Sequence, residues 1–252
     1  MSEAIRAVER ALDVLMCFTS QTPELTLTQI SERIGINKST VHRLLSTLEG
    51  KRFVERDPST GVYRPGLRLL QMASLAMEQN SLRRLAAPFL QDLCNQYREN
   101  VNLALLDGAD VIYVDVIEGS QRVKLAAVPG QRLPAFCTAS GKAILAFLSE
   151  DHVKHVLERG MPGYTQATIT SPEEFLENVH EIRGRGFAIS EQENEDGINA
   201  IAAPICNQPI ASISIAGPAY RLTRDRMLEI GPKLLATAKK IALEVERGLD
   251  ME

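Results

Sequence analysis

Apolar positions recur with the period of an α-helix along the first third of the chain. In the helix predicted over residues 38–51, four of them share one stripe at i, i+3, i+4 and i+7: Val41, Leu44, Leu45 and Leu48. Apolar residues also follow one broad face of residues 4–19 and much of the circumference of residues 67–79. We therefore predict helices here too, the last with the length of a connector between domains.

Cap and turn residues place a further short helix just before the helix over 38–51. Thr26 and Gln29 form a capping-box pattern at its start. Gly35 can take the left-handed conformation that a sharp reversal needs, and Asn37 is a good N-cap for the helix that follows. Two short helices joined by such a turn are typical of the DNA-binding unit whose second helix enters the major groove.

The polar face of the second helix carries short hydrogen-bonding side chains and no acid before Glu49. Arg can read guanine in the major groove, and Ser and Thr can bind bases or phosphates. The residues expected to face DNA are Lys38, Ser39, Thr40, His42, Arg43, Ser46 and Thr47. The alternative is an ordinary amphipathic helix, although its solvated face would usually mix Glu and Lys.

A hairpin is predicted directly after this helix. Two β-prone runs, residues 53–56 and 62–65, are joined by a turn that contains Pro and Gly. In this place a hairpin is the wing of a winged helix-turn-helix. Arg56 and Arg64 lie on its arms, where they can meet phosphate or enter a minor groove. An exposed hairpin with incidental arginines is the alternative.

The chain is basic only around these elements. Its net charge is −4, so it is not a general binder of polyanions. Residues 33–64 hold seven basic and three acidic side chains, whereas residues 67–252 hold nineteen basic and twenty-four acidic ones. A basic patch on an acidic body can hold DNA through counterion release.

Length and composition bound the remaining possibilities. With 252 residues, 44% of them hydrophobic, the chain has room for two domains. No apolar run reaches the length of about 18 residues that suggests a transmembrane helix, so no membrane partner is expected. The four cysteines are scattered without a CxxC pair, which favours a reducing cytoplasm over a disulfide framework or a structural zinc.

From residue 81 onward the pattern alternates between helices and strands. Helices are expected over residues 82–97, 140–148, 151–159, 172–185 and 223–249. Strands are expected over residues 101–106, 111–117, 122–128, 187–189, 198–205 and 210–216. Hairpin-linked strands with helices between them suggest an α+β domain around one mostly antiparallel sheet.

Residues with other possible chemistry form weak patterns. Gly141-Lys142 lacks the earlier glycine of a phosphate-binding loop, and no nucleophile elbow is present. His152 and His155 lie at helical spacing without a third ligand nearby, so neither a metal nor a cofactor is expected. The acidic loop over 191–196 is interpreted as a solvated turn.

Several segments, in their order and spacing, resemble the IclR family of bacterial transcription regulators over nearly the full chain. They are residues 4–12, 37–45, 133–143, 185–188, 194–197, 202–204 and 214–218. The resemblance implies a winged helix-turn-helix with three helices and a β-wing, a linker helix, and a GAF-like α/β domain that binds a small effector. The boundaries expected for these three parts are 1–66, 67–80 and 81–252.

The resemblance also implies partners. They are double-stranded operator DNA, expected to be palindromic, a second copy in a homodimer or a dimer of dimers, and an effector that is commonly a carboxylate. The linker helix is expected to be buried either against another subunit or on its own domain. No catalytic residue is implied.

Carried over by position, the effector pocket would be lined by Leu125, Ala139, Ser140, Ser190, Ala200, Ser214 and Ala216. Leu125 is the apolar wall expected from the strand over 122–128. Free amides before Gly141-Lys142 at a helix N-terminus would suit a carboxylate. Members that respond to glyoxylate and pyruvate have an acid, a cysteine and a second serine where this chain has Ser190, Ala200 and Ala216. These departures favour a larger or less polar ligand than a small oxo-acid.

Two other classes of function stay open at this point. A small-molecule enzyme with an accessory winged helix would need an acid, a base or a nucleophile that converges on the pocket. A winged helix used only for protein contacts would leave DNA affinity unchanged in Arg43→Ala.

Overall fold

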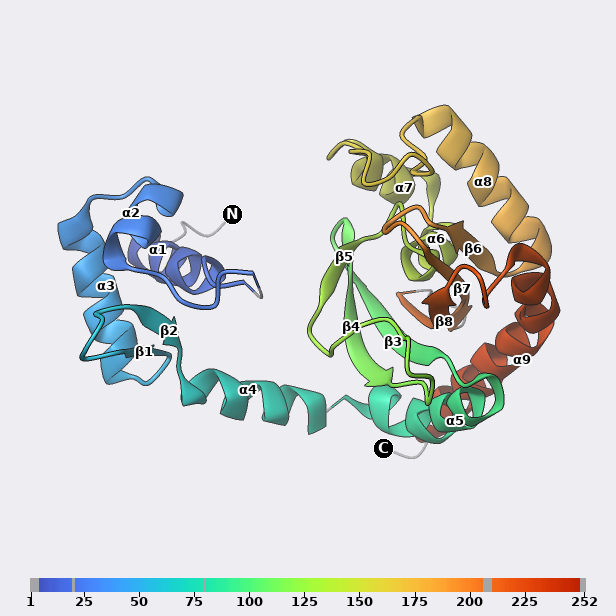
Figure 1. Cartoon of the computed structure of the whole chain (residues 1–252), viewed down its shortest axis with the longest axis horizontal. Helices are drawn as coiled ribbons and strands as arrows, with labels where there is room; N and C mark the ends of the chain where they lie inside the picture. Colours follow the sequence, from blue (N-terminus) through green and yellow to red (C-terminus); the bar gives the residue numbers. More distant parts are fainter. Residues whose placement is uncertain (1–4, 20, 79, 206–209, 250–252) are drawn as a thin grey trace. The chain divides into compact units, whose positions relative to one another are not determined.

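The computed structural model describes residues 5–19, 21–78, 80–205 and 210–249. The chain divides into two compact units, Met1–Gln79 and Asn80–Glu252 (Figure 1). Each unit has a hydrophobic core of its own.

The N-terminal unit is a three-helix domain with a two-stranded sheet and one further helix. Its elements are α1 (Arg6–Met16), α2 (Leu27–Ile34), α3 (Lys38–Gly50), β1 (Val54–Arg56), β2 (Tyr63–Pro65) and α4 (Leu67–Glu78). The predicted winged helix-turn-helix is confirmed. Helix α1 ends at Met16, earlier than expected, and Thr19 and Thr22 bond to each other through their backbones, at 3.3 and 3.0 Å, instead of continuing the helix.

The predicted caps set the path between the helices. Thr26 Oγ1 accepts from the Gln29 amide at 3.3 Å, and Gln29 Oε1 accepts from the Thr26 amide at 2.8 Å. Gly35 ends α2 with a φ of 64°, a conformation that costs glycine little. Asn37 Oδ1 accepts from the Thr40 amide at 2.9 Å and begins α3. These local contacts fix the angle at which α3 leaves the domain.

The C-terminal unit is an antiparallel sheet covered by helices on both faces. Its helices are α5 (Ser81–Tyr97), α6 (Ala139–Leu145), α7 (Glu150–Leu157), α8 (Pro172–Arg185) and α9 (Arg224–Leu249). Its strands are β3 (Asn100–Asp107), β4 (Asp110–Ile117), β5 (Arg132–Pro134), β6 (Ala188–Glu191), β7 (Ile198–Ile205) and β8 (Ala211–Pro218). The six-stranded sheet has the order β5-β4-β3-β8-β7-β6, and every neighbouring pair is antiparallel.

The two faces of this sheet differ in side-chain size. Large residues such as Ile213 and Ile215 pack with α5 and α9 in one core. The alternate positions of β8 hold Ser212, Ser214 and Ala216, and Ser212 bonds to the carbonyl of Ser140 in α6. Helices α6, α7 and α8 contribute to a second core on this face. Small side chains on this second face leave room above the sheet.

The prediction of a strand over residues 122–128 is wrong. The edge of β4 is instead paired by β5, with Ile112 opposite Arg132. Carbonyl groups of the segment accept hydrogen bonds from side chains: the Leu125 carbonyl from Asn100 Nδ2 at 2.8 Å, and the Val123 carbonyl from Arg221 at 2.7 Å. The segment over 118–131 therefore forms a strap, and the backbone hydrogen bonds that join it to β4 lie at its end, between Tyr113 and residues 130 and 131.

Helix α4 buries none of its residues in the chain, which does not support docking on its own domain. Among the residues described, no helix has both the length and the apolarity that a bilayer crossing requires.

Candidate functional site

The outer face of α3 presents the residues that the sequence predicted to face DNA. Lys38, Ser39, His42, Arg43, Ser46 and Thr47 are exposed, and Thr40 is half-buried. The opposite face buries Val41 and Leu45 in the core, so the packing of α3 directs its polar face outward.

Some of these polar groups already have partners. Ser39 Oγ donates to Asn37 Oδ1 at 2.8 Å, and Thr47 Oγ1 donates to the Arg43 carbonyl at 2.9 Å. Among the described residues, the side chains of His42 and Arg43 have no such partner within the chain. Their donors are available to a ligand in the major groove.

The wing is held by its own side chains. Arg64 forms an ion pair with Glu55 at 3.3 Å across the hairpin, and Arg56 lies 5.8 Å from the centre of the Tyr63 ring. Asp57 accepts from Ser59 at the turn, and this hydrogen bond, more than the weaker ones beside it, lowers the pKa of Asp57 to about 2. Glu55 partly balances the charge of Arg64, whereas Arg56 has no ion-pair partner among the described residues.

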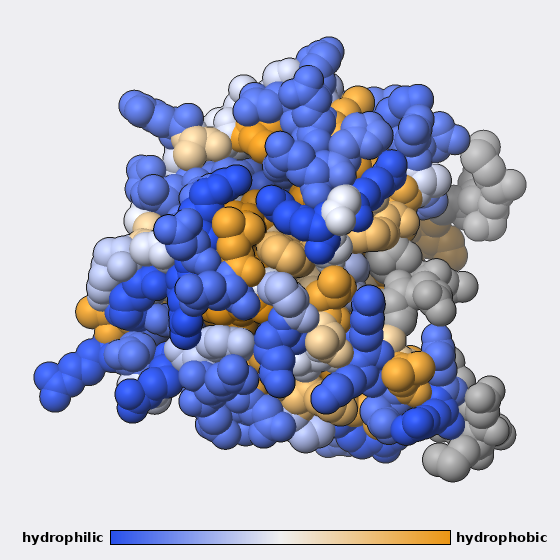
Figure 2. Space-filling model, turned by 90° about the vertical axis from the view of Figure 1, so that its right-hand side faces the viewer, coloured by the Kyte–Doolittle hydropathy of each residue, from blue (hydrophilic) through white to orange (hydrophobic). Residues whose placement is uncertain are grey.

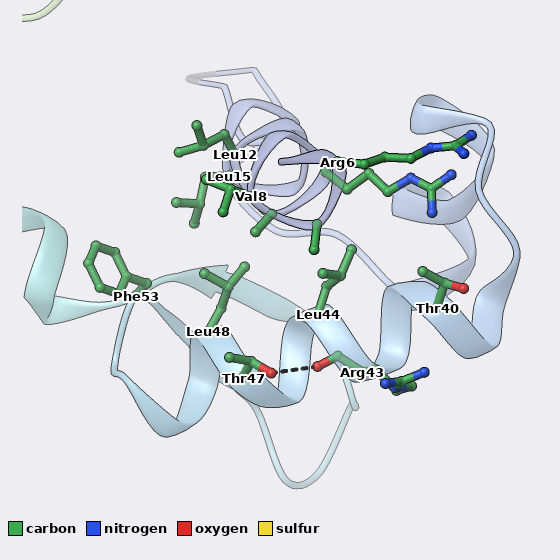
Figure 3. Close-up of a pocket in the computed structure, with 13 residues that line it drawn as sticks. Arg6, Val8, Leu12, Leu15, Thr40, Arg43, Leu44, Thr47, Leu48 and Phe53 are labelled. Atoms are coloured by element: carbon green, nitrogen blue, oxygen red, sulfur yellow. Dashed lines mark hydrogen bonds between the residues drawn. The ribbon is translucent and has the colours of Figure 1, made fainter. Parts of the chain in front are cut away.

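A groove of about 730 Å³ runs between α1 and α3. Figure 3 shows that its two ends differ: Leu12, Leu15 and Phe53 lie at one end, and Arg6 and Arg43 lie at the other. The apolar end continues on the surface of α1, which exposes several large apolar side chains: Ile5, Val8, Leu12 and Met16.

In the C-terminal unit, a small cavity lies above the sheet beside α6. It brings together most of the positions carried over for the effector, namely Leu125, Ala139, Ser140, Ser190, Ala200 and Ala216. Ser214 is not among the lining residues. It is buried on β8 and bonded to Asn102 Nδ2 at 3.3 Å.

Sequence reasoning missed about half of the lining residues: Tyr113, Gln131, Leu133, Thr138, Asn194, Glu195 and Ile198. Thr138 carried a readable signal, because Thr is a favoured N-cap and its Oγ1 accepts from the Gly141 amide at 3.2 Å. Tyr113 carried a weaker one, as a polar residue within an apolar strand. Burial raises its pKa to about 12, against a lowering contribution from a hydrogen bond with Ser140.

The protein uses several hydroxyl groups around this cavity for its own contacts. Ser190 Oγ donates to the Cys137 carbonyl at 3.0 Å, and Ser212 Oγ donates to the Ser140 carbonyl at 3.1 Å. These bonds tie strands β6 and β8 to the start of α6. They fix the spacing between the sheet and the loop that precedes the helix.

The acidic loop over 191–196 is not the fully solvated turn that was expected. Glu193 is buried and forms an ion pair with Lys142, whose side chain is 1% exposed, at 2.5 Å. Desolvation lowers the pKa of Lys142 and raises that of Glu193, while the attraction between the two charges opposes both shifts. Ser140 and Asn194 line the cavity, and Lys142 and Glu193 lie close to them in sequence. The ion pair therefore connects the wall formed by α6 to the wall formed by the acidic loop.

The strap over 118–131 closes another wall. Asn100 is fully buried, and its Oδ1 accepts from the Gly119 amide at 3.0 Å while its Nδ2 holds the Leu125 carbonyl. Arg221 holds the Val123 carbonyl and makes two bonds to Glu99, at 2.6 and 2.9 Å. Leu125 is thereby fixed over the cavity without a strand.

Comparisons with known proteins match both units of the chain. Residues 74–243 match the family described as bacterial transcriptional regulator IclR C-terminal, and residues 7–58 match the IclR helix-turn-helix domain. The chain belongs to the IclR family. It is a DNA-binding transcription regulator with a C-terminal ligand-binding domain.

Relatives match over nearly their full length. The HTH-type transcriptional regulator KipR of Bacillus subtilis (strain 168) is 34% identical over 253 residues, covering 99% of each chain. The transcriptional repressor IclR of Escherichia coli (strain K12) is 32% identical over 245 residues, covering 95% of this chain and 89% of the relative. A crystal structure of an IclR regulator from Alicyclobacillus acidocaldarius superimposes with a TM-score of 0.85 at 29% identity, covering 96% and 99% of the two chains.

For an IclR-family regulator, the cavity is small. Its volume is about 50 Å³, whereas small-molecule sites usually have about 300 Å³ or more. A ligand larger than a few atoms therefore needs a wall to move. The lining offers hydroxyl and amide groups and one acid, Glu195, and includes no Lys, Arg, His or Cys side chain.

Proposed function

We propose that this regulator reads operator DNA with the outer face of α3 and that a small effector in the C-terminal cavity changes its affinity for the operator. The observation that supports the DNA contact most directly is the exposed, unpaired Arg43 on a helix whose other face is locked into the core. Effector control requires that the effector bind one arrangement of the protein better than another.

The role of Arg43 has a direct test. If Arg43 contacts a guanine, Arg43→Ala weakens operator binding by about 1–3 kcal/mol and relaxes specificity at one base pair. Footprinting and titration at fixed salt measure both effects. Unchanged affinity and specificity in this variant would leave a protein-contact role for the winged helix.

The effector class that we propose is a carboxylate bound at the start of α6, around Ala139 and Ser140. Support comes from the family and from the donors in the lining, which include Tyr113 and Gln131. The test titrates small oxo-acids, aromatic acids and sugar acids against the operator complex, each beside its neutral amide. If the amides act as strongly as the acids, the ligand is not recognised as a carboxylate.

We also propose that the regulator works as a homodimer on a palindromic operator. Helix α4 exposes Leu67, Leu70, Met72 and Leu75, and α1 exposes a second apolar row beside the groove. Exposed apolar surface of this kind marks interaction sites. By contrast, Figure 2 shows a face of the molecule on which charged and polar side chains separate the hydrophobic ones.

Sedimentation of Leu12→Glu and Leu70→Glu tests the dimer. We expect both variants to shift toward the monomer and to lose binding to the full palindrome more than to a half-site. Sedimentation unchanged from that of the parent protein would exclude these helices from the interface. Dimers that pair further into a dimer of dimers would appear in the same runs at higher concentration.

The cavity suits binding better than catalysis. Its lining has hydroxyl groups and one carboxylate, Glu195, but no His, Lys or Cys side chain, and among the described residues no hydrogen bond joins Glu195 to one of these hydroxyls as a base would need. We therefore propose a regulator without an activity of its own. Turnover of any effector found in the titration, followed over hours at high protein concentration, would contradict this.

A further inference from the structure

We propose that Arg6 and Arg10 of α1 bind phosphates of the operator backbone beside the N-terminal end of α3. The inference rests on the DNA-binding function and adds a second, sequence-independent contact to it. Neither arginine lies on α2 or α3, the two helices of the helix-turn-helix motif, or on the wing.

The first argument is position. Arg6 and Arg10 line the same groove as Thr40 and Arg43. In Figure 3, Arg6 lies with Thr40 at the end of the groove opposite Leu12 and Phe53. A recognition helix places its N-terminal residues against the bases. The basic end of the groove between α1 and α3 is therefore the end that lies against DNA. A side chain of α1 that reaches this end meets the DNA backbone at the edge of the major groove.

The second argument is the local cost of these charges. Arg6 is the first residue of α1, where the positive end of the helix dipole disfavours a cation. Arg10 follows at i+4 on the same face, and like charges at this spacing repel. Both arginines therefore destabilise α1 in the absence of a ligand. Residues that break a local rule in this way are expected at functional sites.

The third argument is that no acid in the described chain neutralises the pair. Asp13 lies one turn beyond Arg10 and Glu9 lies one turn beyond Arg6, yet neither forms an ion pair with these arginines among the described residues. Arg6 is exposed and Arg10 is half-buried. Neither guanidinium group has an ion-pair partner among the described residues, so both are available to an anionic ligand.

The contact is expected to be with phosphate and not with bases. Helix α3 is the element that enters the major groove of DNA. Helix α1 lies beside α3 and so reaches the sugar-phosphate backbone at the edge of the major groove. Such contacts position a protein on DNA and raise affinity for all sequences alike. They also make binding more sensitive to salt.

The experiment measures operator and non-specific binding of the full chain over a range of salt concentrations. Because each subunit of the dimer carries the substitution, we expect the slope of log K against log [salt] to fall by about 2 for Arg6→Ala and for Arg10→Ala, and by about 4 in the double variant. The ratio of operator to non-specific affinity stays unchanged within about twofold. Arg6→Lys/Arg10→Lys keeps both charges and restores the slope.

Arg122→Ala, which removes an exposed charge from the other unit, is the matched control and leaves the slope unchanged. Slopes equal to wild type in both alanine variants would overturn the proposal. So would weaker binding at an unchanged slope together with loss of the dimer in sedimentation, since the arginines would then belong to a subunit contact. If the wild-type protein binds no operator at all, the DNA-binding function itself is wrong. This result differs from a failure of the arginine proposal, in which the wild-type protein binds and the variants keep its slope.

Discussion

The outer face of α3 and the wall of the effector cavity use polar residues in opposite ways. On α3, Arg43 and Ser46 are exposed and have no partner in the described chain. Around the cavity, Asn100 and Lys142 are almost fully buried, and each is bonded to a segment far away in sequence. The first set is available to a ligand; the second set builds the place where a ligand can bind.

Because of this difference, substitutions in the two regions should have different effects. A change on α3 removes contacts that exist only in the complex, so it should alter affinity and leave the fold intact. A change in the cavity wall leaves a buried group without its partner, so it should lower stability before it alters ligand binding. The predictions below test this separation, starting with the largest effect.

The largest effect is expected for Lys142→Met, which leaves Glu193 buried without its cation. Breaking a buried ion pair from one side typically costs about 3–5 kcal/mol. The free energy of unfolding, measured by urea titration with circular dichroism, should fall by this order. Amide hydrogen exchange should place the loss in the C-terminal unit, with α3 and the wing unaffected.

The matched control is Lys142→Met/Glu193→Met, which replaces both charges with apolar groups. Because the desolvation of both charges then disappears, the double variant should recover most of the loss. A double variant as unstable as the single one would mean that packing around Lys142 matters more than its charge.

Local signals in the sequence predicted the N-terminal unit well. The capping box at Thr26, the glycine at position 35 and the N-cap at Asn37 act over a few residues, so they can be read without knowledge of the fold. In the C-terminal unit the strand over residues 210–216 was also predicted, and Ile alternates with Ser or Ala along residues 212–216. The cavity positions that were predicted, about half of the lining, came from the family resemblance.

What the sequence did not predict depends on distant partners. Residues 122–128 have the composition of a strand, but Arg221 holds the Val123 carbonyl from 98 residues away. The acidic loop has the composition of a solvated turn, but Lys142 pairs with Glu193 across 51 residues. No local pattern marks either contact, because both depend on which segments the sheet brings together.

The next effect in size is expected for Asn100→Ala. The change removes the hydrogen bonds to Gly119 and Leu125 and leaves buried backbone groups unpaired, at a cost of about 2 kcal/mol. Hydrogen exchange in residues 118–131 should rise most. Asn95→Ala, at an exposed position on α5, is the control and should leave exchange in that strap unchanged.

A smaller and purely local effect is expected at the wing. The pKa of Asp57 is lowered from 3.8 to about 2, so its contribution to the turn is complete above pH 3.8 and is lost as the pH falls through about 2. Exchange of the Ser59 and Thr60 amides should rise over that window. In Asp57→Asn this pH dependence should disappear, and if it persists, another group controls the turn.

The smallest effect on stability is expected for Ser46→Ala, and its comparison with Ser190→Ala isolates the difference between the two regions. Ser46 is exposed on α3 and has no partner, so its loss should change the free energy of unfolding by less than about 0.5 kcal/mol, while operator affinity falls. Ser190 is 4% exposed, and its hydroxyl donates to the Cys137 carbonyl, so the same change of side chain should cost about 1–2 kcal/mol. In Ser190→Ala, operator affinity without effector should stay unchanged. If both variants changed stability equally, burial and partners would not explain how the two regions respond to substitution.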